Sequence, residues 1–183
     1  MSAPLERDVA HVGAAADCSY RAEDIERSDA FRRAYAQAPN VVTPEQMPFE
    51  RSPDGLIKHL INERMNTREM CIEAYMHFLK AGERSGRHRH MWEEVLFVAE
   101  GGGHDLHWDL KFDCADAFDY TWEAEPRRFD WTQGDFIYVP PFTIHQHFSA
   151  EDGGEARLIV ISNRIVKAMG FDWLDQLENA PGY

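Results

Sequence analysis

The feature that most constrains this chain is a series of short strand-like segments separated by glycine and proline, running from about residue 56 to residue 164. The clearest segment spans 104–112, where apolar residues and His104 alternate with polar ones, the period of two expected of a half-buried strand. Further strands are predicted at 69–80, 94–99, 119–123, 128–132, 135–139, 143–149 and 156–164. Many short strands at this spacing are typical of an antiparallel sandwich or barrel, so we predict one all-β domain over 56–166.

Segments with helical character flank this domain. Residues 21–38 contain neither glycine nor proline and stop before Pro39, which predicts a helix, and four prolines that follow indicate an extended arm within residues 1–55. In the C-terminal part, 167–183, apolar residues at helical spacing predict a short amphipathic helix near 171–179.

Composition narrows the function classes. The 183 residues suit a single domain, and a formal net charge of −13 disfavours binding to phosphate backbones or anionic lipid, so we expect neither nucleic acid nor membrane as a partner. No apolar run reaches a membrane-spanning length, and the three cysteines are odd in number and widely spaced. We therefore expect a cytoplasmic protein.

The densest group of potential metal ligands lies in residues 86–101. His88 and His90 are two apart, so on a strand both imidazoles leave the same face and can bind one ion. Glu94 would lie about 13 Å from His90 on a straight strand, and it can join them only if the chain turns at 91–93. After the Pro140–Pro141 pair, His145 supplies a third imidazole, provided that the fold brings it across.

These residues resemble the two sequence motifs of the cupin superfamily. The first, G(x)5HxH(x)3,4E(x)6G, is matched at Gly82, His88, His90, Glu94 and Gly101. The second, G(x)5PxG(x)2H(x)3N, is matched at Gly134, Pro140 and His145, with Phe142 in place of its second glycine and Ser149 in place of its asparagine. The resemblance implies a double-stranded β-helix, or jelly-roll barrel, and a homodimer to which an arm at 39–55 could contribute. A narrower similarity is to single-domain cupins near gentisate dioxygenase.

Other residues are candidates for roles around the metal. His147 lies two beyond His145 and shares its strand face, which makes it a candidate proton carrier or a hydrogen-bonded core histidine. His104, Trp108 and Tyr138 are candidates for substrate binding, although packing roles would also suit them, and His107 is expected to face solvent. A small basic group could attract an anionic substrate: Arg84, Arg87 and Arg89.

Three imidazoles and one carboxylate suit Fe(II) first, and also Mn, Ni, Cu or Zn, and leave coordination positions open. We therefore expect a non-haem iron dioxygenase that acts on a small, aromatic, carboxylated molecule. Two alternatives stay open. The metal could serve only as a Lewis acid in an isomerase, lyase or decarboxylase, or the barrel could bind a small molecule without catalysis.

Overall fold

The computed structural model of the protein describes residues 19–65, 67, 71–113 and 119–183, in two compact units, residues 1–38 and 39–183. The described part of the first unit is essentially helix α2 (Tyr20–Gln37), which confirms the helix predicted at 21–38. No helix in the described ranges combines the length and the apolar character needed to cross a membrane.

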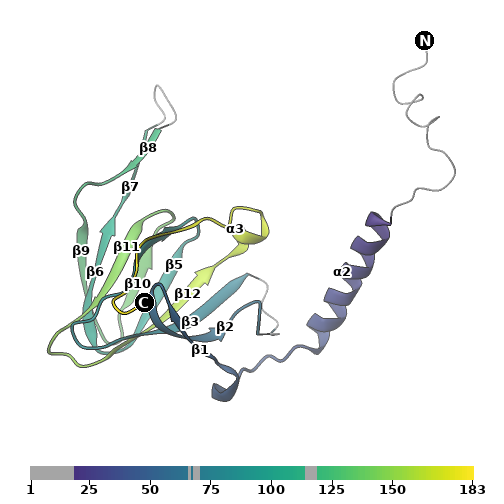
Figure 1. Cartoon of the computed structure of the whole chain (residues 1–183), viewed down its shortest axis with the longest axis horizontal. Coiled ribbons are helices and arrows are strands. Elements are labelled where there is room, and N and C mark those ends of the chain that lie inside the picture. The colour runs from purple at the N-terminus through teal and green to yellow at the C-terminus, as the bar shows by residue number, and fades with distance from the viewer. Residues whose placement is uncertain (1–18, 66, 68–70, 114–118) are drawn as a thin grey trace, which may run out of the picture. The chain divides into compact units, whose positions relative to one another are not determined.

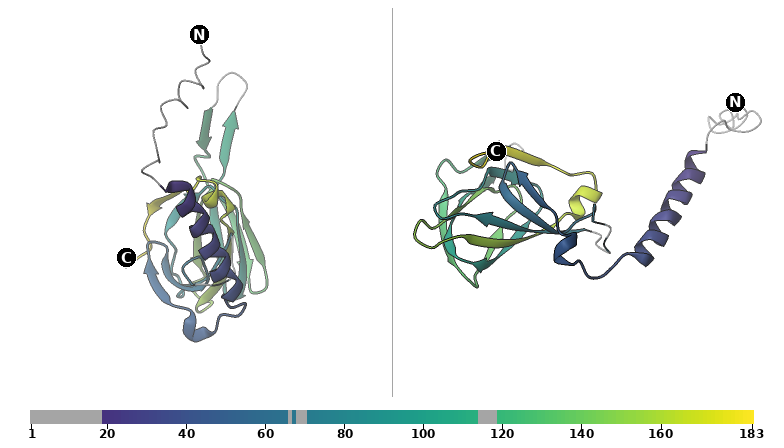
Figure 2. Two further views of the ribbon diagram at one scale, coloured as in Figure 1. Left: turned by 90° about the vertical axis from the view of Figure 1, so that its right-hand side faces the viewer. Right: turned by 60° about the horizontal axis from the view of Figure 1, so that its bottom comes forward.

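The second unit is built from two antiparallel sheets and a short hairpin (Figures 1 and 2). The six-stranded sheet has the order β1 (Phe49–Ser52), β2 (Gly55–Ile61), β3 (Ile72–Leu79), β12 (Ala156–Asn163), β5 (Glu94–Glu100), β10 (Phe136–Val139). The five-stranded sheet has the order β13 (Leu174–Glu178), β4 (Arg87–His90), β11 (Ile144–Ser149), β6 (Gly102–Trp108), β9 (Arg127–Thr132). This arrangement is the predicted double-stranded β-helix, or jelly-roll barrel.

Glycines make the tight connections that the barrel needs. Gly101 joins β5 to β6 with a φ of +81°, and a Cβ there would lie 2.8 Å from the carbonyl oxygen of Glu155. Gly134 joins β9 to β10 with a φ of +95°. Residues with a side chain rarely adopt this left-handed conformation, which explains the glycines at these two motif positions.

The barrel interior divides into an aliphatic half and a polar half. The aliphatic half is a cluster contributed mainly by the six-stranded sheet: Leu79, Leu96, Val98, Trp131, Ile137, Val139, Ala156, Leu158 and Val160. The inner face of the five-stranded sheet instead carries buried polar side chains: His88, His90, Asp105, His107, His145 and His147. Buried polar groups are costly unless they are paired, so the polar half indicates where function resides.

A hairpin between the two motifs is formed by β7 (Leu110–Asp113) and β8 (Asp119–Trp122), which project beyond the barrel (Figure 1). It contacts the body of the protein through Trp122, whose Nε1 donates a hydrogen bond of 2.8 Å to the carbonyl of Phe142. The hairpin is thereby tied to the turn that precedes β11.

The structure corrects one prediction at the C-terminal end of the barrel and adds detail at the other end. A short C-terminal helix exists, but it is α3 (Ile165–Ala168), and the segment predicted to be helical at 171–179 contains strand β13. Its residues pair with β4, because hydrogen bonds along that open sheet edge outweigh a local helical spacing. The arm predicted before residue 55 includes the short 3₁₀ helix η1 (Pro44–Gln46) and β1, which pairs with β2 of the same chain.

Candidate metal centre

Strand β4 presents its two histidines inward, as the spacing predicted. His88 and His90 are buried, whereas Arg89 points to the other side and its Nε donates a hydrogen bond of 2.8 Å to Asp175. Strand β4 ends at His90 and β5 begins at Glu94, so the chain does turn at 91–93. Because of this turn, Glu94 lies close to the histidine pair instead of further along the same strand.

His145 reaches the same place because β11 lies beside β4, with His145 directly opposite His88. The turn before β11 contains Phe142, which stands where the cupin motif has glycine and adopts a φ of +61°. Its backbone N–H donates a 2.8 Å hydrogen bond to the carbonyl of His90, and its ring contacts Trp173. These contacts hold a non-glycine residue in a conformation that is otherwise disfavoured.

The four predicted ligands converge. The ring centroid of His145 lies 4.3 Å from that of His88 and 4.9 Å from that of His90. Glu94 reaches both sides, with Oε2 3.5 Å from Nε2 of His90 and Oε1 3.9 Å from Nε2 of His145. One ligand atom from each of the three histidines lies within 4.8 Å of the other two.

The Nδ1 atom of each candidate ligand histidine faces an acceptor. In His90 the acceptor is the carbonyl oxygen of Trp92 at 2.7 Å, and in His145 it is the carbonyl oxygen of Thr143 at 2.9 Å. Because a carbonyl can only accept, Nδ1 is the donor in both rings, which leaves Nε2 as the nitrogen available to a metal ion. Nδ1 of His88 lies 3.0 Å from Oδ1 of Asp54, an ion-pair approach rather than a well-aligned hydrogen bond.

The atoms left over are those that a metal ion would use. Nε2 of His90, Nε2 of His145 and Oε1 of Glu94 are buried and have no hydrogen-bond partner among the described residues. Such orphaned atoms cost free energy in a folded protein, and a divalent cation would satisfy all three together. The donor set of neutral imidazoles and one carboxylate therefore fits a transition-metal ion.

The electrostatics suit the same arrangement. Burial alone would raise the pKa of Glu94, but the imidazoles of His90 and His88 outweigh it and hold this pKa below its usual value. Burial, followed by the proximity of His88 and His90, lowers the pKa of His145 well below its usual value, which keeps that ring neutral. An ionised Glu94 and a neutral His145 are two of the protonation states that metal binding requires.

Sequence reasoning missed one contact to Glu94. Ser162 on β12 lies directly opposite Glu94 on β5, and its Oγ donates a 3.0 Å hydrogen bond to Oε2. The carboxylate is thus fixed through one oxygen while the other stays free. Nothing local in the sequence marks Ser162, because its role depends on the pairing of strands 68 positions apart.

A second buried polar group lies beside the candidate ligands. Asp105 is fully buried and accepts a hydrogen bond of 2.7 Å from Nε1 of Trp131 at Oδ1, while its Oδ2 lies 2.9 Å from Nδ1 of His147. Nε2 of His107 lies 3.4 Å from the same Oδ2. Burial opposes ionisation of Asp105, but His147 and His107 outweigh it and hold its pKa far below the usual range.

The predicted phase of β6 was wrong, which is why Asp105 was missed. His107 pairs with His145, and Asp105 pairs with His147, so these residues share the inner face, and His107 is buried rather than solvent-exposed. The alternation of apolar and polar residues was read correctly, but the polar residues face inward, since the interior of this sheet is the polar half.

The three residues predicted to contact substrate lie elsewhere. His104 stacks on Phe148 with 4.8 Å between ring centroids, and both belong to the outer face of the five-stranded sheet, as does Trp108. Tyr138 is 53% exposed, and its hydroxyl donates a hydrogen bond to Glu93. None of these three side chains therefore faces the barrel interior beside the candidate ligands.

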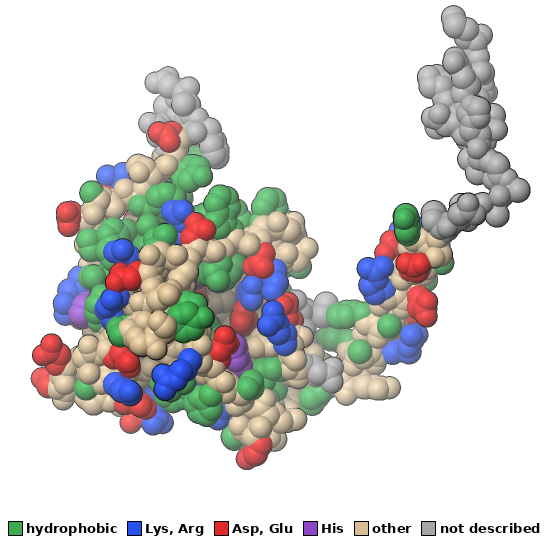
Figure 3. Space-filling model, viewed as in Figure 1, with side chains coloured by type: hydrophobic (Ala, Val, Ile, Leu, Met, Phe, Trp, Pro, Cys, Tyr) green, Lys and Arg blue, Asp and Glu red, His purple; other side chains and the backbone are tan. Residues whose placement is uncertain are grey.

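The three arginines of the basic group form ion pairs with acidic residues of β13. Arg84 and Arg87 approach Glu178, at 2.6 and 3.7 Å, and Arg89 lies 2.7 Å from Asp175. The space-filling view shows acidic and basic side chains interspersed over the visible face of the barrel (Figure 3). These arginines form ion pairs that hold β13 against the barrel. This structural role explains the basic group without a role in substrate binding.

Comparisons with known proteins agree on the fold. No family model and no curated protein sequence matches the chain. Two solved structures resemble it over 76% of its length at 15% identity: vicilin from Corylus avellana, with a TM-score of 0.57, and oxalate decarboxylase from Bacillus subtilis, with a TM-score of 0.56. This chain covers 36% and 32% of those two chains, about a third of each.

A barrel of more similar size is a cupin 2 conserved barrel domain protein from Rhodopseudomonas palustris, at 20% identity and a TM-score of 0.47, with 76% of this chain and 74% of that chain covered. The sheet topology of this chain and its likeness to the first two structures show the jelly-roll fold.

Proposed function

We propose that this chain is a metal-dependent enzyme that holds one divalent ion between His88, His90, Glu94 and His145. The observation that carries the proposal is which ligand atoms at the site have hydrogen-bond partners and which do not. Nδ1 of His90 and of His145 faces a backbone carbonyl, and the Nε2 atoms of both rings, like Oε1 of Glu94, are buried without a hydrogen-bond partner among the described residues. Fe(II) is the first choice of ion, with Mn, Ni, Cu or Zn as alternatives.

Fe(II) at such a site would supply redox chemistry toward oxygen and a Lewis acid toward a chelating substrate. Four protein ligands would leave coordination positions open to small molecules, which suits a dioxygenase acting on a small aromatic carboxylate. The chain's own contribution is a dry and ordered setting. Trp92 is buried, stacks on the His90 ring with centroids 4.6 Å apart and excludes water from that side.

His147 is the proposed acid–base residue. Its Nδ1 faces the buried carboxylate of Asp105, and a ligand atom of His147 lies within 4.8 Å of one from Glu94 and one from His145. Burial opposes protonation of His147, but Asp105 outweighs it and raises its pKa above the usual value. A carboxylate-held imidazole beside the metal is equipped to donate or accept a proton at Nε2.

The same pair favours a second candidate, a metal-dependent decarboxylase, lyase or isomerase. These reactions need proton delivery to carbon or oxygen but no oxygen molecule, and His147 with Asp105 would provide it. One of the solved structures that share the fold is an oxalate decarboxylase, which supports this candidate. The two candidates differ in their requirement for oxygen.

Metal analysis tests the site. Purified protein is expected to contain about one transition-metal ion per chain, and His88→Ala is expected to lose it. His104→Ala is the matched control, because His104 is a histidine on the outer face of the same five-stranded sheet and should retain the metal. Full metal content in His88→Ala would overturn the ligand assignment.

Turnover tests the reaction. The metal-loaded protein is incubated with a panel of small aromatic carboxylates and dicarboxylates, in air and under argon, with oxygen consumption and product formation followed together. Consumption of oxygen with ring or side-chain oxidation supports a dioxygenase, and equal turnover under argon refutes it in favour of the Lewis-acid reactions. Ligand binding without any product would indicate a binding module.

We also propose that the protein is a homodimer, as the resemblance to cupins implies. Several large apolar side chains near the C-terminal strand are exposed in the single chain: Phe171, Trp173, Leu174 and Leu177. A second copy would cover such residues. Light scattering coupled to size-exclusion chromatography decides the matter, since a mass near 21.1 kDa at micromolar concentration would contradict it.

A further inference from the structure

One of the three candidate ligand histidines has a partner unlike the other two. His90 and His145 direct Nδ1 at neutral backbone carbonyls, but Nδ1 of His88 lies 3.0 Å from the carboxylate of Asp54. Asp54 belongs to the turn between β1 and β2, well before both sequence motifs. It comes from the segment for which the sequence suggested only an arm.

We propose that Asp54 is a positioning residue of the metal centre, which fixes His88 with Nε2 toward the ion and adds the second negative charge that a buried divalent cation needs. The inference rests on the proposed metal binding and deepens it. A histidine whose Nδ1–H faces a carboxylate is both oriented and made a stronger donor at Nε2.

Charge balance supports this role. The four proposed ligands contribute one negative charge, from Glu94, because the three imidazoles bind a metal in their neutral form. A divalent ion would therefore leave a net charge of +1 in the buried half of the barrel, where uncompensated charge is expensive. The carboxylate of Asp54, in contact with a ligand, brings the sum to zero.

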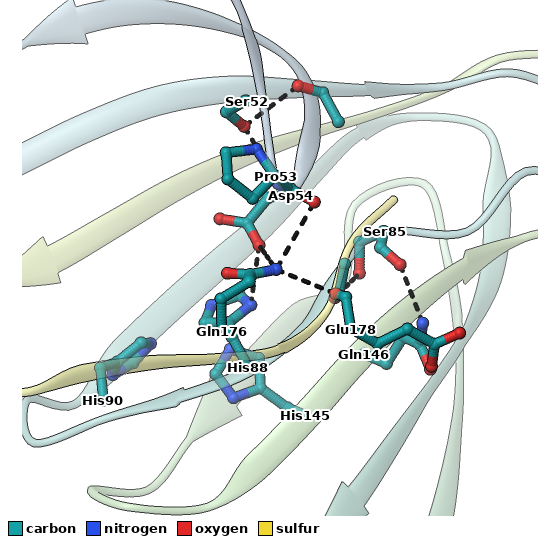
Figure 4. Close-up of polar contacts among 12 residues, drawn as sticks. Ser52, Pro53, Asp54, Ser85, His88, His90, His145, Gln146, Gln176 and Glu178 are labelled. Atoms are coloured by element: carbon teal, nitrogen blue, oxygen red, sulfur yellow. Dashed lines mark hydrogen bonds and ion pairs between the residues drawn. The ribbon is translucent and has the colours of Figure 1, made fainter. Parts of the chain in front are cut away.

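The protein holds Asp54 in place with a residue from the other end of the chain (Figure 4). Nε2 of Gln176, on β13, donates a 3.1 Å hydrogen bond to Oδ1 of Asp54 and lies 3.0 Å from the carbonyl oxygen of Glu178. Gln176 is also paired with His88 across the β13–β4 ladder. The C-terminal strand thereby links the β1–β2 turn to the strand that carries the ligands.

The close packing around Gly86 is independent evidence that the fold holds Asp54 beside His88. A Cβ at Gly86 would lie 2.3 Å from Nε2 of Gln176 and 2.5 Å from the carbonyl oxygen of Pro53, so any side chain there would displace the groups that hold Asp54. Its backbone N–H donates a 3.1 Å hydrogen bond to the carbonyl of Asp54. The glycine is required by close approach of Gln176 and the β1–β2 turn.

The chain offers a matched control. Asp175 is a carboxylate on β13 that pairs with Arg89 on β4, as Asp54 pairs with His88, but Arg89 points to the opposite side from the ligands. Asp175→Asn and Asp54→Asn are the same chemical change at two ion pairs with the same strand. If the position of the carboxylate next to His88 matters for metal binding, only Asp54→Asn should change the metal affinity.

The experiment measures the affinity of metal-free protein for Co²⁺ by competition with a chelator, together with the visible absorption spectrum of the Co²⁺ form. Asp54→Asn is expected to bind Co²⁺ about 10- to 100-fold more weakly than the unaltered protein, with a changed spectrum. Asp175→Asn is expected to match the unaltered protein in both. Thermal unfolding of the metal-free proteins shows whether each variant is folded.

Gly86→Ala keeps Asp54 and His88 but crowds Gln176, so it gives a second, independent variant, and it too should weaken Co²⁺ binding. If both Asp54→Asn and Gly86→Ala leave affinity and spectrum as they are in Asp175→Asn, the inference is overturned while the metal site stands. Failure of the proposed function is separate and visible in another arm, because the unaltered protein would then bind no Co²⁺.

Discussion

The buried pair of Asp105 and His147 allows a sharp test, through Asp105→Asn. The substitution keeps the size of the side chain but removes its charge, and it replaces one acceptor oxygen with an amide that can only donate. The bond from Trp131 to Oδ1 can survive, but Nδ1 of His147, which lies 2.9 Å from Oδ2, would face a donor. The raised pKa of His147 would lose its cause.

The magnitude follows from burial. Asp105 is 0% exposed and His147 is 1% exposed, so solvent cannot replace the lost interaction. Removing one partner of such a buried pair costs about 3–5 kcal/mol of the free energy of unfolding, and we expect about 3 kcal/mol because one hydrogen bond is retained. At a urea dependence of roughly 2 kcal/mol per molar, the midpoint should fall by about 1.5 M.

The effect should also depend on pH, with a sign for each partner. The folded pKa of Asp105 is lowered, so its contribution is present above an unfolded pKa of about 3.9 and is lost as the pH falls toward the folded value. The folded pKa of His147 is raised, so its contribution is present below about 6.5 and is lost as the pH rises through the folded value. The two overlap near pH ~5.5, where the cost should be largest.

Urea unfolding of the metal-free protein, followed by tryptophan fluorescence at about pH 5.5 and 8.5, measures this cost. Other buried histidines, such as His77 with a pKa lowered to about 4 by burial, weaken both proteins on acidification, so the difference between them isolates the pair. Asp130→Asn, which removes a carboxylate from an exposed pair with Arg128, should cost less than about 1 kcal/mol. A cost of under about 1 kcal/mol for Asp105→Asn, or one independent of pH, would refute the reasoning.

Three further predictions can be checked with the same methods. Phe142→Gly should be about 1 kcal/mol more stable than Phe142→Ala in urea unfolding, because only glycine adopts a φ near +61° without strain; the reverse order would contradict the argument. Ser162→Ala should weaken Co²⁺ binding several-fold, by releasing Oε2 of Glu94, and unchanged affinity would show that the hydrogen bond is dispensable. Leu158→Ala should cost about 2–5 kcal/mol, since Leu158 is fully buried in the aliphatic half, and a cost below about 1 kcal/mol would place that core elsewhere.

Local sequence was enough for several features of the fold. Strand and turn positions follow from alternation and from glycine, because backbone periodicity depends on neighbours in the chain. The same reasoning placed His88 and His90 on one face and required a turn before Glu94, and the structure confirms both. Gly101 and Gly134, which the sequence matched to motif positions, stand at tight connections where φ is positive.

Other features depended on packing partners that local sequence does not reveal. Whether Asp105 faces inward is decided by which face of β6 meets the interior, and both phases have the same alternation. The segment that carries Gln176 forms a strand because β4 offers an open edge, although its apolar spacing favours a helix.

The sequence by itself thus determined which side chains could bind a metal and the local turns that they require. The tertiary structure decided their surroundings, by bringing Asp54, Ser162 and Asp105 next to candidate ligands or to the His147 beside them, from strands or turns far away in the chain. The physical reason is that ligand spacing is a property of one backbone segment, whereas the partners that orient and charge-balance those ligands are set by sheet pairing across the barrel.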